Sequence, residues 1–317
     1  MNKSKLITTS ALATVMSATS AYAELSISGG MGGWFYTADN VTSSSRTWNT
    51  ESVNVTYSDT LDNGMGISVG ANVGGTGGTT STNNTNMTIS ISSDMGSISI
   101  GDQIASAADK ADGINGLSLF ECCTWGSTVP DGMSAGYDDG DGSQGNEGFL
   151  YSSPSLAGWT VYLSHGQKAS ASSENAEDVN GAAIKGAIGP IAVSGGINSR
   201  GDYSTAGVLT SGYDSTFGQA AMDLGPMNVS VGIMNGGGTR TDSNAIAVTM
   251  PLMGMTARAA YVDSDASGAS YDESGYQIGV AKSLGAATFG VQYDNADIAA
   301  GAAGEVETWK LAYQIYF

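Results

Sequence analysis

The sequence has few positive charges, few cysteines and few prolines, and these shortages remove whole classes of protein. It carries 11 Lys and Arg against 30 Asp and Glu, a formal net charge of −19 at pH 7. A surface of that sign repels nucleic-acid phosphates, so no nucleic-acid partner is expected. The 2 cysteines are the adjacent Cys122 and Cys123, which excludes a disulfide-rich scaffold. Whether this pair is two thiols or a strained disulfide stays open.

Long apolar runs are also lacking beyond the N-terminus. Lys3 and Lys5 precede the run LITTSALATVMSA, which leads into Ala21-Tyr22-Ala23, the A-x-A form of a signal-peptide cleavage site. We therefore predict a secretory signal peptide over residues 1–23 and a mature chain over residues 24–317, whose net charge is −21 because two lysines are lost from −19. No later stretch approaches the ~20 apolar residues of a membrane-spanning helix, so any entry into a membrane must use strands.

Glycine is abundant, at 46 residues against 5 prolines, yet the chain does not look disordered because apolar residues recur at every second position. This period predicts sixteen strands. They centre on residues 24–36, 53–57, 65–73, 87–91, 98–100, 147–153, 159–163, 182–184, 191–197, 213–217, 227–233, 246–250, 255–261, 276–280, 287–293 and 309–317.

The opposite face of these segments carries Gly, Ser, Thr, Asn and Gln, as in Asn54, Thr56 and Ser58. Such a face packs poorly in a soluble sandwich or solenoid, which are the alternative folds, but it hydrates well. Closing the sheet leaves no unpaired backbone amide in lipid. The expected fold is therefore all-β, a 16-stranded antiparallel transmembrane barrel with an apolar outside and a wet lumen.

The connections between the segments are of two kinds, which alternate along the chain. Eight are long and polar, and the longest covers residues 103–146. The other seven are short turns with Gly, Pro, Asn or Asp, at 61–64, 93–96, 153–158, 189–190, 225–226, 251–254 and 283–286. This alternation puts both ends of the mature chain on the short-turn side.

Charged and aromatic residues follow the same two-faced pattern. Lys185, Arg258 and Lys310 occupy positions opposite the apolar set of their strands, where a charge avoids the ~2–4 kcal/mol cost of the lipid midplane. Lys282 shares the apolar face but lies beside a turn, where its side chain would reach the membrane interface. Aromatic residues near strand ends fit interfacial girdles: Trp34, Tyr36, Trp159, Tyr261, Tyr293 and Trp309.

Four features resemble the general, trimeric 16-stranded porins of Gram-negative outer membranes, especially the alphaproteobacterial type. They are ELSISGG after the AYA site, GSISIGDQ at 96–103, FLYSSPSLAGW at 149–159 and the terminal Phe317. The resemblance implies short periplasmic turns, long outer loops and a third loop, 103–146, folded into the lumen. It also implies a homotrimer in the lipid bilayer of the cell outer membrane, surrounded by lipopolysaccharide. In that family the last strand closes the barrel, and its terminal aromatic is read by the outer-membrane barrel assembly machinery.

The third loop carries most of the expected function. Seven acids stand against Lys110 alone in it: Asp109, Asp112, Glu121, Asp131, Asp138, Asp139 and Asp141. In a channel about a Debye length across, ~8–10 Å, such carboxylates concentrate cations, although the 138–141 group could instead form a solvated mouth. We expect a weakly cation-selective, water-filled diffusion channel for ions and small hydrophilic solutes.

Three points stay open beside that expectation. The lumen-facing basic candidates are Arg46, Lys185, Arg258 and Lys310, and the sequence does not tell which reach the constriction. A substrate-specific channel with a binding site at the constriction is the alternative function. An enzyme is not expected, because the single histidine, His165, has no evident acid two positions away.

A metal site is weakly indicated. DSDASG at 263–268 begins like a calcium loop, but Glu273 falls one position early and no helices flank it. A solvated loop is the simpler interpretation. No cofactor is expected, apart from Ca²⁺ held loosely at acidic outer loops, where divalent cations would bridge lipopolysaccharide.

Overall fold

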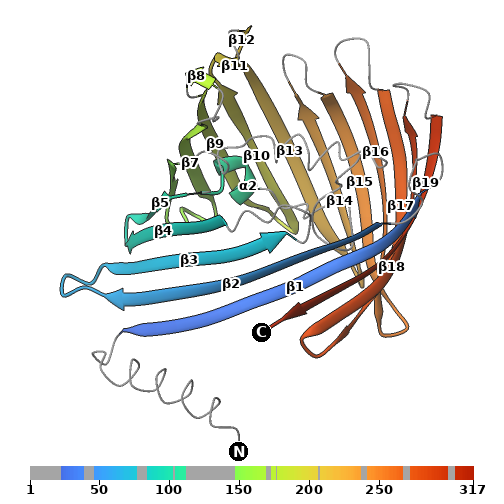
Figure 1. Ribbon diagram of the computed structural model, residues 1–317, viewed down its shortest axis with the longest axis horizontal. Helices are drawn as coiled ribbons and strands as arrows, with labels where there is room; N and C mark the ends of the chain where they lie inside the picture. The colour runs from blue at the N-terminus through green and yellow to red at the C-terminus, as the bar shows by residue number, and fades with distance from the viewer. Residues whose placement is uncertain are drawn as a thin grey trace, which may run out of the picture.

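The computed structural model describes residues 23–38, 46–76, 84–102, 104–111, 147–168, 173–175, 177–205, 208–236, 241–266, 272–298 and 304–317. These form one closed barrel of sixteen strands with a small additional sheet and a short helix (Figure 1). The barrel strands are β1 (Glu24–Ala38), β2 (Arg46–Thr60), β3 (Gly66–Thr76), β4 (Asn84–Ser93), β5 (Gly96–Gly101), β6 (Glu147–Ser152), β7 (Thr160–Lys168), β9 (Glu177–Ile188), β10 (Ile191–Arg200), β13 (Tyr213–Leu224), β14 (Met227–Asn235), β15 (Thr241–Leu252), β16 (Met255–Ala266), β17 (Asp272–Leu284), β18 (Ala287–Ile298) and β19 (Gly304–Tyr316).

Each barrel strand pairs antiparallel with the next barrel strand along the chain, and β19 pairs with β1. Each of the sixteen segments predicted from the period-2 pattern matches one barrel strand, so the predicted fold is confirmed. Among the residues described, the structure contains no helix with the length and apolar character needed to cross a membrane.

The two faces of the sheet differ as the alternation requires. On β14 the outward Val231 and Ile233 are 44% and 63% exposed, whereas the inward Ser230 and Met234 are 7% and 5% exposed. Long apolar side chains such as Ile27 and Phe35 are likewise exposed on the outside of β1. An apolar surface of this extent is stable only against lipid, because in water it would oppose folding.

The short turns are built on glycine in the left-handed backbone conformation. Every one of the seven predicted turns contains a glycine with positive φ, and in the 251–254 turn Met253 (φ 52) and Gly254 (φ 76) both adopt it. Two successive positive φ angles define a two-residue type I′ hairpin between Leu252 and Met255, whose twist matches that of the flanking strands. The predicted turn positions are confirmed.

The C-terminal residue is held within the closed sheet. Gly29 N–H donates to the Phe317 carbonyl oxygen at 2.9 Å, and Phe317 N–H donates to the Gly29 carbonyl oxygen at 3.0 Å. On the other side, Tyr316 N–H donates to the Ala286 carbonyl oxygen at 3.0 Å. The closure of the barrel therefore runs to its last residue.

Aromatic residues form a contiguous row on the outside of β16 to β19. Tyr261 and Trp309 are exposed there, and the Tyr293 ring centroid lies 4.9 Å from that of Trp309 and 6.1 Å from that of Tyr276. Trp159 also lies on the outside, where its ring covers Gly186. For Trp34 and Tyr36 the register gives inward positions, paired with Ala312 and Lys310, which does not fit an outward girdle; their side chains are outside those the structure describes.

Lys282 lies where its sequence position predicts. It is exposed, pairs with Phe289 on the outward face and is two residues from the end of β17.

Two features of the fold have no signal in the sequence. Three short strands, β8 (Ser173–Asn175), β11 (Tyr203–Thr205) and β12 (Val208–Thr210), form a separate sheet in the order β12-β11-β8. The helix α2 (Ala107–Ala111) follows β5. Segments of three to five residues are too short to display a period of 2 or 3.6.

Candidate functional site

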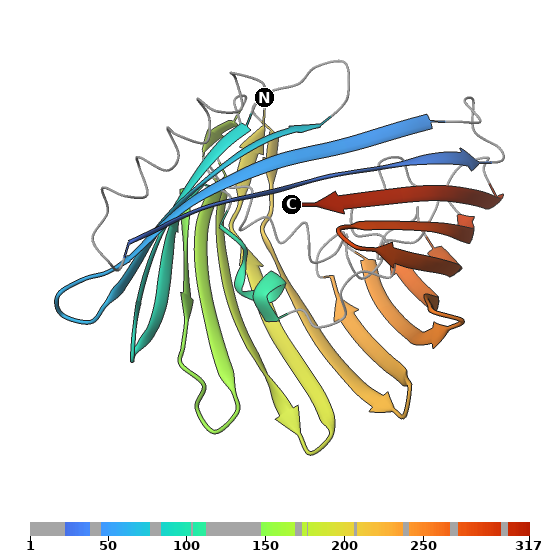
Figure 2. The same cartoon turned by 90° about the horizontal axis from the view of Figure 1, so that it is seen from below.

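The helix α2 lies inside the barrel, against the inner face of β7, β9 and β10 (Figure 2). Its sequence is Ala-Ala-Asp-Lys-Ala, and the three alanines are fully buried while Lys110 is exposed. Small methyl groups let the helix backbone approach the wall closely, and Ile104 is buried beside them. The start of the third loop is thus packed onto one wall of the lumen, in agreement with the expected inward fold of that loop.

Three inward residues of the wall form the seat on which α2 rests. Ser164 on β7 pairs with Gly181 on β9, and Gly181 pairs with Asn198 on β10. Ala107 N–H donates to Ser164 Oγ at 2.9 Å. A Cβ placed on Gly181 would lie 2.5 Å from Ser164 Oγ, 2.8 Å from Asn198 Oδ1 and 3.2 Å from the Ala107 Cβ. The α2 seat, defined as Ser164, Gly181 and Asn198, therefore has no room for a larger residue at 181.

The wall opposite the α2 seat carries a buried ion pair. In the closed strand order, β19 lies eight steps from β9 in either direction. Lys310, at the middle of β19, places Nζ 2.8 Å from Asp294 Oδ2, with exposed fractions of 17% for the lysine and 0% for the aspartate side chain. Gln292 Nε2 donates to Asp294 Oδ1 at 2.6 Å. The carboxylate of Asp294 therefore compensates the positive charge of Lys310 within the lumen wall.

Three of the four predicted lumen-facing basic residues share one line of directly paired residues across the sheet. It runs from Arg258 through Gly279, Gln292, Lys310 and Tyr36 to Arg46. Because strands in a barrel are tilted, such a line climbs along the axis. Arg258 is near the turn end of β16, Lys310 at the middle of β19 and Arg46 at the loop end of β2.

Lys185 lies apart from that line, on β9 near the turn end, at an inward position like that of Gly181. The four basic residues are thus spread over the height of the lumen rather than gathered at one level. The side chain of Arg46 is not among those the structure describes.

The acidic half of the predicted constriction is mostly outside the described residues. Asp109 belongs to α2, but its side chain is not described. The other predicted acids and both cysteines fall in residues 112–146, outside the described ranges: Asp112, Glu121, Asp131, Asp138, Asp139, Asp141, Cys122 and Cys123. The acidic constriction therefore stays a prediction.

The lumen wall formed by β2 to β5 has a different character. Asn72 Nδ2 donates to Asn54 Oδ1 at 2.5 Å, and the Oγ atoms of Ser90 and Ser99 lie 2.7 Å apart in a hydrogen bond. All the inward side chains described on these four strands are uncharged, and they are partly exposed over most of their length. This wall offers water a surface of hydroxyl and amide groups.

His165 does not belong to the lumen. Its Nδ1 lies 2.8 Å from Asn180 Oδ1 and its ring centroid 5.9 Å from that of Phe149, on the outward face of β7. In the part of the chain described, no group of three His, Cys, Asp or Glu is placed to hold a metal ion.

Asp294 and the α2 seat are the functional residues that sequence reasoning missed. Asp294 could have been found, since its position alternates with the apolar Val291 and Tyr293, which predicts an acid on the inward face of that strand. The seat could not, because Ser164, Gly181 and Asn198 look like any other small inward residues until the register aligns them.

A closed barrel with an apolar outside, a polar inside and a helix packed within the lumen defines the class of pore-forming membrane channels. Residues 8–314 match the Gram-negative porin family, and the chain belongs to that family. This membership and the fold support a location in the outer membrane and indicate a channel rather than an enzyme.

Solved porin structures share this fold at low sequence identity. The anion-selective porin from Comamonas acidovorans matches with a TM-score of 0.74 and 14% identity, over 93% of this chain and 100% of that chain. A triple mutant of Rhodopseudomonas blastica porin matches with a TM-score of 0.65 and 14% identity, with the same coverage of 93% and 100%. A search of curated protein sequences gave no match.

Proposed function

We propose that this outer-membrane channel is water-filled and weakly cation-selective, and that ions and small hydrophilic solutes pass through it by diffusion. The observation that carries the proposal is the wall of β2 to β5, whose described inward side chains are uncharged and include hydroxyl and amide groups. The same lumen contains α2, which rests on Ser164, Gly181 and Asn198. A lumen lined by hydroxyl and amide groups favours water over any particular solute.

The sign of the selectivity is argued from charge. The chain carries 30 acids against 11 Lys and Arg, and Asp294 offsets Lys310, the basic residue that faces the α2 wall at mid-height. Fixed negative charge in a narrow aqueous path raises the local cation concentration. Because a porin named as anion-selective has the same fold at 14% identity, the side chains and not the barrel decide the sign.

Reversal potentials across a planar bilayer under a KCl gradient test this proposal. We expect the sign that corresponds to preferential passage of K⁺, with a magnitude well below the Nernst limit. Preferential passage of Cl⁻ would overturn the selectivity and leave the channel itself in place. Absence of any conductance from a folded barrel would overturn the diffusion channel as well.

The proposal also covers how the protein is exported and assembled. We infer that residues 1–23 direct export, that Phe317 is read by the barrel assembly machinery, and that the mature chain works as a homotrimer in contact with lipopolysaccharide, with Ca²⁺ held loosely at its acidic outer loops. The two backbone bonds between Phe317 and Gly29 support a role for that residue in closure. N-terminal sequencing that begins at Glu24 and current traces with three equal closing steps are the expected results.

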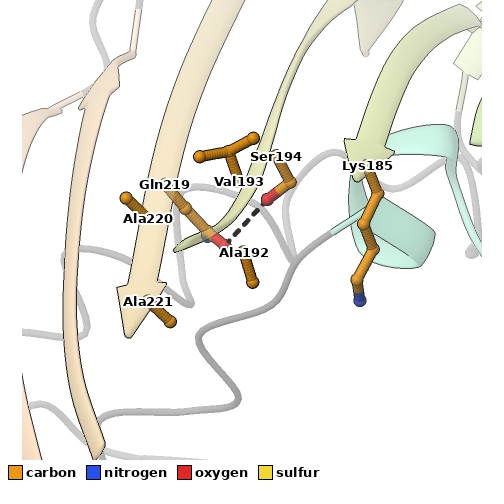
Figure 3. Close-up of a pocket in the computed structure, with 7 residues that line it drawn as sticks. All are labelled: Lys185, Ala192, Val193, Ser194, Gln219, Ala220 and Ala221. Atoms are coloured by element: carbon orange, nitrogen blue, oxygen red, sulfur yellow. Dashed lines mark hydrogen bonds between the residues drawn. The ribbon is translucent and has the colours of Figure 1, made fainter. Parts of the chain in front are cut away.

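A substrate-specific channel remains the second candidate. A depression lined by Lys185, Ala192, Ser194 and Gln219 favours it (Figure 3).

A further inference from the structure

Two pairs of neighbouring hairpins on opposite sides of the barrel end in turns of different character. In the closed strand order, each of the strands β13 to β16 lies eight steps from one of the strands β2 to β5. The turns that join β13 to β14 and β15 to β16 carry exposed apolar side chains at their tips. We call Leu224, Leu252 and Met253 the apolar rim.

The apolar rim continues the outward apolar face of its strands without a break. On β15 every second residue from Ile246 to Leu252 is apolar and outward, and Leu252 pairs with Met255 at the turn. On the neighbouring hairpin Leu224 pairs with Met227 in the same way. Over the turn-side half of these four strands the outward face carries no charge. The surface that suits lipid therefore extends to the turn tips.

Met253 has an unusual backbone conformation for a methionine. It adopts a positive φ of 52° in the type I′ turn, where Asn, Asp or Gly is the usual residue, and its side chain is 91% exposed. In water a small polar residue would suit this turn better, because methionine both strains the backbone and exposes an apolar chain. Acyl chains around the side chain would offset that strain.

The two turns between β2 and β5 are acidic by contrast. Asp62 and Asp94 are exposed in the turns at 61–64 and 93–96. Asp59 already lies on the outward face of β2, three residues before Asp62, and it accepts a hydrogen bond from the Tyr57 hydroxyl at 3.0 Å. A charged side chain is costly in the hydrocarbon region. On a strand tilted by about 40°, the hydrocarbon boundary on this side therefore ends roughly 8 Å short of the turn tip.

We propose that the apolar rim is immersed among the acyl chains of the membrane leaflet on the turn side, whereas the acidic turns between β2 and β5 stay in water. The boundary of the membrane then runs obliquely to the turn-side edge of the barrel. Lipid fits the apolar rim better than a protein partner does, because the rim has no polar border and is continuous with the outward face of the barrel.

Nitroxide spin labels on matched residues of the two sides test this placement. Met253 and Met95 are both methionines at turn tips, with exposed fractions of 91% and 77%, and Leu224 and Leu61 are both leucines beside a turn, with 45% and 42%. A single label is attached in each of four variants: Met253→Cys, Met95→Cys, Leu224→Cys and Leu61→Cys.

The labelled protein is the full mature chain with Cys122→Ser and Cys123→Ser, so that only one thiol reacts. It is reconstituted alone into phospholipid vesicles that are formed in the presence of the relaxing reagent, which then reaches both sides of the membrane. Molecular oxygen concentrates among acyl chains, and a neutral nickel chelate stays in water. Heat-modifiable electrophoretic migration checks that each variant is a folded barrel.

We expect oxygen to accelerate the relaxation of the labels at 253 and 224, with most of the effect of the nickel chelate lost there. At 95 and 61 the nickel chelate should have the larger effect. Each side is represented by two positions, so one variant that fails to fold leaves the other matched pair to decide.

Three outcomes would overturn the proposal. A dominant effect of the nickel chelate at 253 and 224 would place the apolar rim in water. Protection of these labels from both reagents would show that protein covers the rim, which in these vesicles can only be a second copy of this chain. A dominant effect of oxygen at all four positions would mean that the membrane reaches both sides equally, so that its boundary is not oblique.

Discussion

The wall formed by β7, β9 and β10 and the wall formed by β18 and β19 face each other across the lumen, and they are built by different means. In the first wall the contact is made by small residues: Gly181 in the sheet and the alanines of α2 let the helix lie close against the strands. The second uses charge: Lys310 and Asp294 are paired at 2.8 Å, and the acid is fully buried. The width of the lumen should therefore depend on the first wall, and the ion selectivity of the channel on the second.

The largest effect is expected from Gly181→Val, which fills the α2 seat. The added Cβ would meet Ser164 Oγ at 2.5 Å and Asn198 Oδ1 at 2.8 Å. Moving the serine hydroxyl aside breaks its bond with Ala107 N–H, and α2, which has the wall behind it, shifts into the lumen. We expect single-channel conductance to fall by roughly a third, since conduction follows the width of the narrowest section.

Gly70→Val is the control for that prediction. Gly70 faces the lumen on β3, and the nearest atom to a Cβ there is Thr56 Oγ1 at 3.9 Å. The same volume is added where the lumen is open, so conductance should change little. Equal conductance in the two folded variants would contradict the role of the α2 seat.

A smaller effect is expected from Asp294→Asn, which removes the negative charge that pairs with Lys310. Asparagine keeps the shape and an oxygen for Gln292, but it leaves the ammonium group of Lys310 uncompensated. The reversal potential under a KCl gradient should move by a few millivolts toward Cl⁻, because one positive charge is added to the lumen wall. The conductance should change less than in Gly181→Val.

The double variant Asp294→Asn with Lys310→Gln tests whether the pair is responsible. It restores neutrality at that point, so its reversal potential should return to that of the unsubstituted protein. A shift that persists in the double variant would mean that the effect of Asp294 does not act through Lys310.

The smallest effect is expected from Ser164→Ala, which removes one hydrogen bond to α2 and adds no volume. Loss of such a bond typically costs about 1 kcal/mol, so α2 should leave its seat more often while its mean position holds. Open-channel current noise should increase at nearly constant conductance. Ser99→Ala, which removes the bond to Ser90 on the wall without a helix, should leave the noise unchanged.

The strands and turns were predictable because each depends on a local rule. Alternation of apolar residues shows a lipid-facing strand wherever it lasts four or more residues, and a glycine in a short polar stretch marks a hairpin. The inward position of Lys185, Arg258 and Lys310 follows from the same alternation. None of these features depends on which strand lies beside which residue.

The features that the sequence alone does not predict depend on strand register and on contacts between residues of different strands. The alignment of Arg258, Lys310 and Arg46 on one line, and of Ser164, Gly181 and Asn198 under α2, follows from pairings between strands that turn lengths alone do not fix. Closeness to a strand end predicts a girdle position for Trp34 and Tyr36, whereas their parity against the exposed Phe35 predicts an inward one, as the register has it.

Single-channel recording of the purified protein in a planar bilayer is the most direct test of a hydrated lumen narrowed from one wall. Discrete current steps should appear, and their size should rise in proportion to the conductivity of the bathing salt, as free diffusion through water requires. Steps that level off with increasing KCl, or a folded barrel that adds no steps at all, would contradict an open aqueous path between α2 and the Lys310–Asp294 pair.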